Sequence, residues 1–305
     1  MEFRHEPVLL AECIEGLAIE PDGAYLDGTL GGGGHSEAIL QRISGGALYG
    51  IDRDEDAIAA AVARLGKNQS FHAIHGNFHD AKKFGLPALD GALLDLGVSS
   101  HQLDVRERGF SYHDDAPLDM RMDRSQPFSA RDIVNGWSER DIARILRDYG
   151  EENWAAHIAK VLVDRRPIET TGQLANIIDA AIPKKLREKE KHPARRTFQA
   201  LRIAVNDELE PLEQALRDIV DLLKPKGRLC VIAFHSLEDR IVKNTFRSLA
   251  DPCTCPKNIP ICVCGKKPVA KLITRKPITA TEEELERNPR SRSATLRIVE
   301  KSEEP

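Results

Sequence analysis

Short apolar runs alternate with helical stretches through the first hundred residues. The apolar runs cover 24–27, 47–52, 71–75 and 91–96. Between the second and third runs, 55–65 is rich in alanine and places Ile58, Val62 and Leu65 on one face, as a crossover helix requires. This rhythm predicts βαβ units and a parallel sheet.

The pattern changes after Ser100. Residues 101–126 are polar, rich in Asp and Arg and without a sustained period, which predicts a long ordered loop. Helical periods follow, with Ser138 and Thr171 as expected N-caps. The α/β pattern then returns as a helix over 209–223, a strand over 228–234, a helix over 236–249 and a strand over 293–299. We therefore predict an α/β fold with a Rossmann-like sheet, in a discontinuous domain over 1–105 and 207–305, with an all-helical insertion over 106–206.

Charge and hydropathy narrow the class of protein. The 305 residues include 44 basic and 48 acidic side chains, and a formal charge of -4 argues against a protein that coats nucleic acid. Basic residues nevertheless gather over 183–196 and 256–276, where a solvated charged face is the alternative to a binding surface. The longest apolar run, 229–234, is too short to span a bilayer, and the start of the chain lacks the features of a signal peptide. We expect a soluble, cytoplasmic protein without a membrane partner.

A glycine-rich turn follows the first predicted strand. Gly31 to Gly34 stand where the chain passes from strand to helix, a place where backbone can approach a ligand closely. Asp52 ends the second strand, 21 residues after Gly31 (52 minus 31), where a carboxylate can accept hydrogen bonds from ribose hydroxyls. Phe78 and Asp95 follow the third and fourth strands. The pattern indicates a nucleotide-type cofactor; a nicotinamide-dependent oxidoreductase stays open, although the GxGxxG spacing is absent.

Several strings carry a resemblance to known proteins. The turn Asp27-x-Thr29-x-Gly31-x-Gly33 resembles that of S-adenosylmethionine methyltransferases, with Thr29 in place of the first glycine. Almost the whole chain resembles the bacterial RsmH (MraW) family, the 16S rRNA cytosine-N4 methyltransferases. The strings are His5-Glu-Pro-Val-Leu-Leu10, 25–36, 94–104, Arg108-Gly-Phe110, 117–123, 192–206, Phe234-His-Ser-Leu-Glu-Asp-Arg240 and 288–293.

The resemblance implies a function, a cofactor and a set of contacts. It implies methylation of a cytidine at N4, in the decoding region of 16S rRNA within the small ribosomal subunit, with S-adenosyl-L-methionine as the cofactor. His101 stands where family members often have proline. The implied cofactor contacts are Gly33, Gly34, His35, Asp52, Phe78, Asp95 and Gln102.

Methyl transfer to cytosine N4 requires hydrogen-bond acceptors near the methyl group, because the lone pair of this nitrogen is delocalised into the ring. Asp95, Ser99 and the carbonyls of 96–98 are the expected acceptors, although the prolines and the aromatic residue of the corresponding amino-methyltransferase turn are missing. We expect Phe110 or Tyr112 to stack on the target base, with core packing as the equal alternative.

Basic residues near the insertion and the C-terminus are the expected RNA contacts, because they can neutralise phosphates. They are Lys184, Lys185, Arg195, Arg196, Arg290 and Arg292. A non-catalytic RNA-binding factor is the second alternative, which the complete set of cofactor residues disfavours. No obligate protein partner is readable from the sequence.

Six cysteines without a signal peptide indicate thiols or metal ligands rather than disulfides. Cys13 and Cys230 stand alone, Cys230 within an apolar predicted strand, and we expect both to pack in the core. Cys253-x-Cys255 and Cys262-x-Cys264 resemble paired metal ligands, although zinc knuckles more often use Cys-x-x-Cys. A zinc site stays open at this point, and no metal is assigned.

Overall fold

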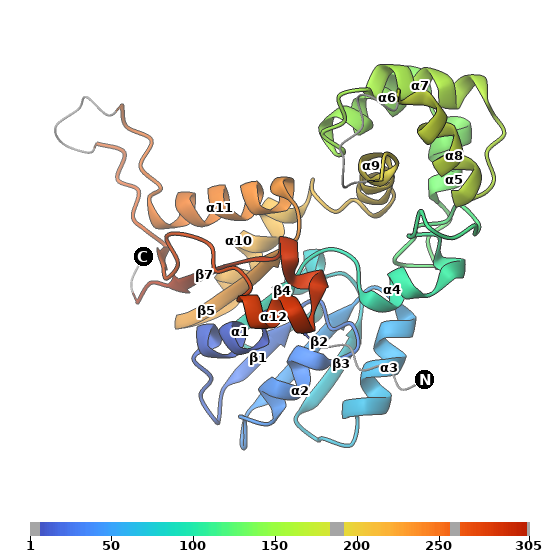
Figure 1. Ribbon diagram of the computed structural model, residues 1–305. Helices are drawn as coiled ribbons and strands as arrows, with labels where there is room; N and C mark the ends of the chain where they lie inside the picture. The colour runs from blue at the N-terminus through green and yellow to red at the C-terminus, as the bar shows by residue number, and fades with distance from the viewer. Residues whose placement is uncertain (1–6, 184–191, 257–262, 304–305) are drawn as a thin grey trace. The chain divides into compact units, whose positions relative to one another are not determined.

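The computed structural model describes residues 7–183, 192–256 and 263–303. The chain divides into two compact units, of which unit 1 combines 1–97 with 209–305 and unit 2 covers 98–208. Each unit has its own elements, which Figure 1 labels along the chain. The sequence analysis placed the two boundaries at 105 and 206, whereas the units divide after Gly97 and after Glu208.

Unit 1 holds a seven-stranded sheet, counted over the described residues, in the order β3-β2-β1-β4-β5-β7-β6. The first five strands of that order are parallel, and β7 runs antiparallel to both β5 and β6. The strands are β1 (Ala24–Asp27), β2 (Ala47–Asp52), β3 (Phe71–His75), β4 (Leu89–Asp95), β5 (Leu223–Ala233), β6 (Ala270–Leu272) and β7 (Thr295–Lys301). The four predicted N-terminal strands are therefore confirmed.

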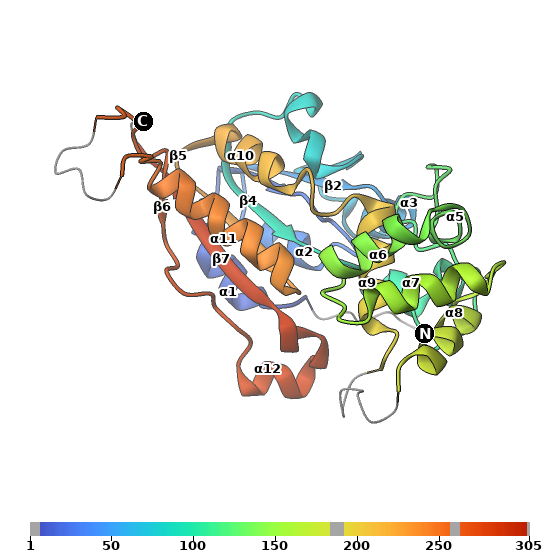
Figure 2. The same cartoon turned by 90° about the horizontal axis from the view of Figure 1, so that it is seen from above.

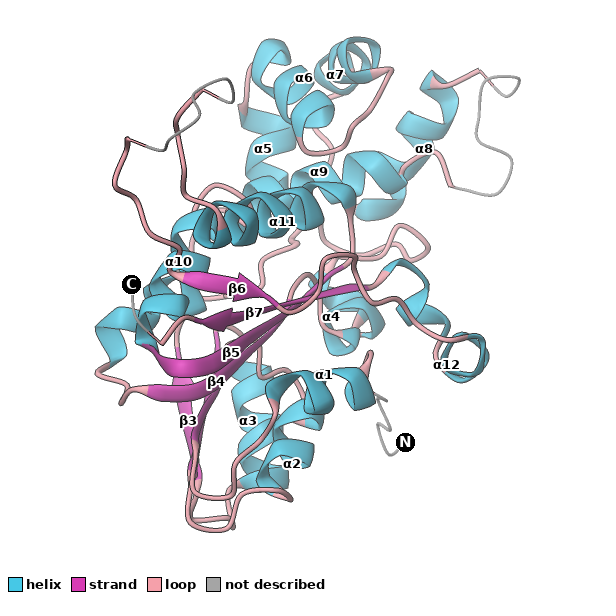
Figure 3. Cartoon of the chain, turned by 90° about the vertical axis from the view of Figure 1, so that its left-hand side faces the viewer, coloured by secondary structure: helices cyan, strands magenta, loops and turns pink. Residues whose placement is uncertain are grey.

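Helices cover both faces of this sheet, as Figures 2 and 3 show. One apolar cluster joins the sheet to η1 (Phe78–Phe84), α10 (Leu212–Leu222) and α11 (Ser236–Ala250). The other joins it to α1 (Leu10–Leu17), α2 (Gly34–Leu40) and α3 (Glu55–Leu65). The short helix α12 (Glu282–Arg287) and η4 (Pro289–Ser293) precede β7. No helix among the described residues combines the length and apolarity that a bilayer crossing requires.

The strand order decides where a ligand can bind. From β1 the chain moves outward through β2 to β3, and it then returns to place β4 on the other side of β1. Open α/β sheets bind ligands beyond the carboxyl ends of the strands at such a switch point. Asp27 ends β1 and Asp95 ends β4, so the switch point carries two carboxyl groups.

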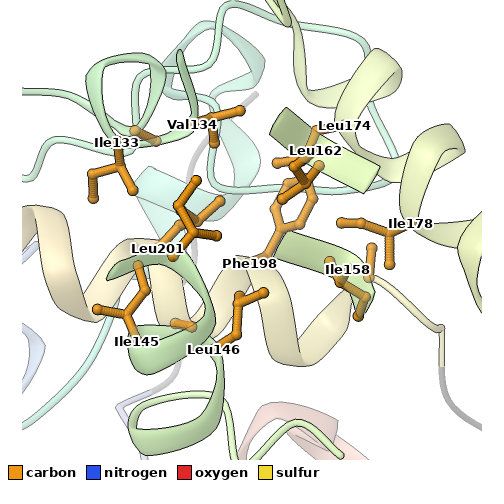
Figure 4. Packing of buried hydrophobic residues seen from close by; sticks show 14 of the residues in the cluster. Ile133, Val134, Ile145, Leu146, Ile158, Leu162, Leu174, Ile178, Phe198 and Leu201 are labelled. Atoms are coloured by element: carbon orange, nitrogen blue, oxygen red, sulfur yellow. The ribbon is translucent and has the colours of Figure 1, made fainter. Parts of the chain in front are cut away.

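Unit 2 is helical, and its core is independent of the sheet. Figure 4 shows Phe198 and Leu201 of α9 among leucine, isoleucine and valine side chains from four other helices. The helical elements are α4 (Ser100–Asp104), η2 (Arg106–Arg108), α5 (Ala130–Gly136), α6 (Glu139–Asp148), α7 (Ala155–Asp164), α8 (Thr171–Ala181) and α9 (Arg195–Asn206).

Buried polar side chains hold the predicted long loop in place. Asn206 at the end of α9 accepts the backbone N–H of Met122 (2.7 Å) and donates to the carbonyl of Met120 (2.8 Å). Arg108, which is buried, donates to the carbonyls of Arg121 and Met122. A buried amide or guanidinium stays stable only with such partners, so these bonds order a segment that has no period of its own.

The structure corrects three details of the sequence prediction. The loop expected over 101–126 begins with α4 and η2, because Ser99 supplies an N-cap that the polar composition concealed. Thr170 rather than Thr171 caps α8: its Oγ1 accepts the N–H of Gln173, while the Thr171 hydroxyl donates to the carbonyl of Asp114. The last strand, expected over 293–299, runs from Thr295 to Lys301, because Glu300 still pairs with β5 and Lys301 pairs with β6.

Candidate active site at the ends of strands β1, β2 and β4

The glycine-rich turn connects β1 to α2 and is open toward solvent. Gly33 is the N-cap of α2 with φ +76°, and a Cβ there would lie 2.9 Å from a leucine methyl group of α3. A Cβ on Gly32 would meet no described atom within 4 Å, and one on Gly34 would collide with Pro7 at 2.5 Å. The turn thus has one side packed against the protein and one side free for a ligand to approach the backbone.

Asp52 at the end of β2 is connected to this turn. One carboxylate oxygen accepts the N–H of Gly31 (2.8 Å), and the other accepts the N–H of Asp54 (2.9 Å). Burial raises the pKa of Asp52 to about 6, although the two N–H donors lower it. Each carboxylate oxygen has two lone pairs, so Asp52 retains acceptor capacity for the hydroxyls of a ribose.

Asp95 at the end of β4 is the most perturbed carboxyl group of the site. Its backbone N–H donates to the Thr29 hydroxyl, and its side chain is 22% exposed. The Oδ1 atom is buried and has no hydrogen-bond partner among the described residues. Burial, together with the charges of Asp27 and Glu238, raises the pKa of Asp95 to about 8. An unpaired buried carboxyl oxygen is costly, which marks Asp95 as a group arranged for a ligand.

His35 lies beside Asp95 and is neutral. Its Nε2 lies 2.9 Å from the carbonyl of Val8, and because a carbonyl only accepts, this nitrogen carries the proton. Burial lowers the pKa of His35 to about 4. Nδ1 therefore presents a lone pair, 3.8 Å from Oδ2 of Asp95. Because the Nδ1 lone pair of His35 faces this oxygen, the ionised form of the Asp95 carboxyl group is disfavoured, which also raises its pKa.

Two residues near Asp95 were missing from the sequence-predicted set. Asp27 is buried, accepts the Ser36 hydroxyl (2.7 Å), and has its pKa raised to about 6 by burial. Glu238 of α11 is buried and accepts the N–H of Phe234 (2.9 Å). Asp27 belonged to the motif and carried a signal, but nothing local in the sequence connects Glu238 to the end of β4. The charges of Asp27 and Glu238 beside Asp95 create a potential that favours a cationic ligand.

The donor set therefore fits S-adenosylmethionine, which carries a sulfonium and an ammonium group beside a ribose. Asp52 provides acceptors for hydroxyl groups, and the Gly31–Gly33 turn leaves room for close approach of backbone. Asp27 and Glu238 provide negative potential, and the unpaired Oδ1 of Asp95 lacks the partner that a ligand would provide.

Phe78 and its neighbour His79 begin η1, directly after β3. Phe78 is 7% exposed and packs in the core of unit 1, with its ring edge-on to that of His79 at 4.4 Å between centroids. Its contact with adenine stays a prediction, since most of the ring is covered. His79 was not predicted: burial lowers its pKa to about 4, and Nε2 is buried with no hydrogen-bond partner among the described residues.

Ser99 and Gln102 belong to unit 2, where they cap α4. The N–H of Gln102 donates to the Ser99 hydroxyl (3.2 Å), and the N–H of Ser99 donates to the Gln102 side-chain oxygen (3.1 Å). This reciprocal pair is a capping box, which satisfies two N–H groups of the helix start. The capping role is structural, and the predicted roles of both residues in catalysis and cofactor binding stay predictions.

The two aromatic candidates for stacking differ in exposure. Phe110 is 7% exposed and packs in the core of unit 2, with the Arg108 guanidinium 6.0 Å from the ring centroid. Tyr112 is half-buried and stacks on the ring of His192 at 4.7 Å between centroids, edge-on to Phe198. Of the two residues, Tyr112 is the more exposed, whereas Phe110 occupies the core position that the sequence left as its alternative.

The basic candidates lie on both units. Arg195 and Arg196 begin α9 in unit 2 and are partly buried, whereas Arg290 and Arg292 are exposed on η4 in unit 1. Lys184 and Lys185 lie outside the described residues. Their contact with RNA stays a prediction.

Comparison with known proteins identifies the family. The family model described as "MraW methylase family" matches residues 2–302. The chain is 57% identical over 310 residues to Ribosomal RNA small subunit methyltransferase H of Symbiobacterium thermophilum, covering 99% of this chain and 98% of that protein. It is 54% identical over 310 residues to the protein of the same name from Clostridioides difficile, covering 99% and 100%. A solved rRNA methylase from Streptococcus thermophilus aligns with a TM-score of 0.44 at 12% identity, over 98% of this chain and 99% of that one. The family match and the sequence identities show that the chain belongs to the MraW methylase family and is an S-adenosylmethionine-dependent methyltransferase.

Proposed function

We propose that this protein transfers a methyl group from S-adenosylmethionine to N4 of a cytidine in 16S rRNA of the small ribosomal subunit. The names of the relatives support a small-subunit rRNA substrate. The resemblance to cytosine-N4 methyltransferases supports the choice of base and atom. The observation that carries the chemistry is Asp95, whose Oδ1 is buried without a partner at the switch point of the sheet.

Asp95 is suited to hold and accept the protons of an exocyclic amine. In the proposed reaction the carbon–sulfur bond breaks, a carbon–nitrogen bond forms, and one N4 proton leaves to a base. The cofactor, when bound, supplies the electrophilic methyl group. A base with a pKa near the working pH is the most effective acceptor, and burial with the neighbouring carboxyl groups raises the pKa of Asp95 to about 8.

His35 and Thr29 position Asp95. The Thr29 hydroxyl accepts the backbone N–H of Asp95, which joins the turn after β1 to the end of β4. His35 presents Nδ1 toward Oδ2, so Oδ1 is the oxygen left for the substrate or cofactor. Orientation of this kind supplies a large part of the rate when the methyl donor is already activated.

Asp52 and the glycine turn are proposed to hold the cofactor, and the basic residues to hold the RNA. Arg195, Arg196, Arg290 and Arg292 can neutralise phosphates, which makes RNA binding depend on salt. Ser99, Gln102 and Phe78 complete the proposed set through the family resemblance, and Tyr112 is the preferred stacking residue because it is less buried than Phe110.

The direct test is methyl transfer from radiolabelled S-adenosylmethionine to small ribosomal subunits lacking the modification and, separately, to free 16S rRNA. The labelled nucleoside is then identified by chromatography. Asp95→Asn is expected to abolish label in N4-methylcytidine, and cofactor titration of the same variant measures how much Asp95 contributes to cofactor binding. The matched control is Asp90→Asn near the start of the same strand, where Asp90 accepts the N–H of Ala24 (2.8 Å), and it is expected to retain activity.

Two results would contradict the proposal. Label in a nucleoside other than N4-methylcytidine would refute the choice of base or atom while leaving methyl transfer to RNA standing. Full activity of Asp95→Asn would remove Asp95 from the reaction, whatever the product.

A further inference from the structure

Three cysteines gather on the connection between α11 and β6, away from the carboxyl groups of the active site. Cys253 and Cys255 follow the end of α11 at Ala250, and Cys264 precedes the start of β6 at Ala270. Cys262 lies outside the described residues. The other two cysteines of the chain, Cys13 and Cys230, are buried in the core of unit 1.

The sulfur atoms are spaced as ligands of one metal ion. The Sγ atoms of Cys253, Cys255 and Cys264 all lie within 4.8 Å of one another, and those of Cys253 and Cys264 are 3.9 Å apart. Two thiolates at about 2.3 Å from a tetrahedral zinc ion are roughly 3.8 Å apart. A disulfide requires about 2.05 Å. The observed spacing therefore fits coordination.

The surrounding backbone supports negatively charged sulfur. The N–H of Val263 donates to Sγ of Cys255 at 3.4 Å, a contact that stabilises and orients a ligating thiolate. Gly265, directly after Cys264, has φ +65°, a conformation that L side chains disfavour, and it turns the chain there. Lys266 and Lys267 follow in sequence and offset the net charge of about -1 that three thiolates and Zn²⁺ carry together.

Of the described residues in this connection, Val269 packs against the core of unit 1 beside β6, while 251–256 and 263–268 are exposed or partly buried. None of the described residues in 251–256 and 263–269 is buried, and Val263 is 76% exposed. The described residues 251–256 and 263–268 belong to no helix or strand, so other contacts must order them. A structural metal ion can order such residues, because the free energy of metal binding then contributes to the free energy of folding.

We propose that Cys253, Cys255 and Cys264 bind a structural Zn²⁺ ion that closes the connection between α11 and β6. Each thiol releases its proton to solvent as its sulfur binds the ion, and no oxidation or reduction occurs. Thiolate sulfur in tetrahedral geometry selects zinc over the hard cations. The three cysteines fill three of the four tetrahedral coordination positions, and we assign the fourth to no side chain of the described residues.

The test uses the full chain, purified without chelator, and measures its metal content by mass spectrometry. We expect about one zinc ion per chain, and its loss in Cys253→Ser and Cys264→Ser. The matched control is Cys13→Ala, because Cys13 is buried and its pKa is raised well above the ordinary value by burial, so it is a packed, inert thiol. This variant is expected to keep its zinc.

Reconstitution with Co²⁺ alone supplies a second readout that does not depend on enzymatic activity. Tetrahedral thiolate coordination gives sulfur-to-cobalt charge-transfer absorption and intense visible bands, which are expected in the parent and absent in Cys264→Ser. Circular dichroism checks that each variant is folded, as expected for an exposed connection. The proposal is overturned by metal-free protein whose loop thiols all react with alkylating reagent, by a disulfide seen as a mass loss of two hydrogens, or by unchanged zinc in both serine variants.

Discussion

Replacing Asp95 by asparagine is expected to stabilise the protein in the absence of cofactor while it abolishes methyl transfer. The pKa of Asp95 is raised to about 8 by burial and by Asp27 and Glu238, from an ordinary value of 3.8. Between pH 3.8 and 7 the unfolded chain therefore gains free energy by ionising this group, and the folded protein does not. Asparagine removes this difference because it cannot ionise.

The magnitude follows from the pKa shift. About 3 pH units separate the ordinary pKa from pH 7, and each is worth about 1.4 kcal/mol, which gives an upper limit of about 4 kcal/mol. The side chain is 22% exposed, and allowing for solvent screening leaves roughly 2 kcal/mol. The sign is fixed by the raised pKa: the stability is present below about pH 4 and is lost as the pH rises through about 8. The advantage of Asp95→Asn should therefore grow from about pH 6 to about pH 8.

Urea denaturation followed by far-ultraviolet circular dichroism measures this difference. Tryptophan fluorescence does not serve, because Trp137 and Trp154 both belong to unit 2. Hydrogen exchange of the β4 amides reports the same free energy locally. Asp95→Asn that is no more stable than the parent near pH 8, or a difference that is the same at both pH values, would refute the electrostatic reasoning.

The matched control, Asp239→Asn, is expected to change stability in the opposite direction. Asp239 on α11 accepts two hydrogen bonds from the Arg297 guanidinium, at 2.7 and 2.9 Å. Burial raises the pKa of Asp239, but the hydrogen bonds and charge of Arg297 lower it by more. Asp239→Asn is therefore expected to destabilise unit 1 by about 1–3 kcal/mol at neutral pH.

Three further predictions follow from the site. The kcat/KM for the cofactor should rise with pH and level off above about 8, as the pKa of Asp95 requires, and a flat initial-rate profile would contradict its role as the base. Gly33→Ala should lower the free energy of unfolding by about 1–2 kcal/mol, because φ is +76° at this position. Gly32→Ala should leave the stability unchanged and weaken cofactor binding roughly tenfold. Equal unfolding temperatures for the two variants would refute this prediction. Replacing Arg195 and Arg196 by alanine should reduce the salt dependence of RNA binding by about one to two units of slope, and an unchanged slope would exclude phosphate contact.

The locally encoded parts of the fold were predictable from sequence. Hydrophobic periodicity and composition predicted the strands that end at Asp27, Asp52 and Asp95 and the helix over 55–65. This works because buried positions recur at a regular interval along each strand and helix. The glycine turn and the carboxylate 21 residues later were readable for the same reason. The cap of α8 was misplaced by one residue, since two adjacent threonines offer the same hydroxyl and only the hydrogen bonds distinguish them.

The electrostatic character of the site was not predictable, because it depends on residues distant in sequence. Glu238 raises the pKa of Asp95 from α11, and the Thr29 hydroxyl holds the Asp95 backbone from the turn after β1. The sequence left Phe110 or Tyr112 as candidates for stacking, with core packing as the equal alternative, and only the core of unit 2 shows that Phe110 is covered.

The sequence alone therefore determined the kind of sheet, the cofactor turn and the family, since these follow from local hydrophobic periodicity, the spacing of motif residues and short matching sequence strings. The tertiary structure decided which oxygen of Asp95 lacks a partner and which nitrogen of His35 carries the proton. It also decided that Cys264, eleven positions from Cys253, has its sulfur 3.9 Å away. The physical reason is that hydrogen bonding, burial and charge act through space, and strand order sets those distances independently of separation along the chain.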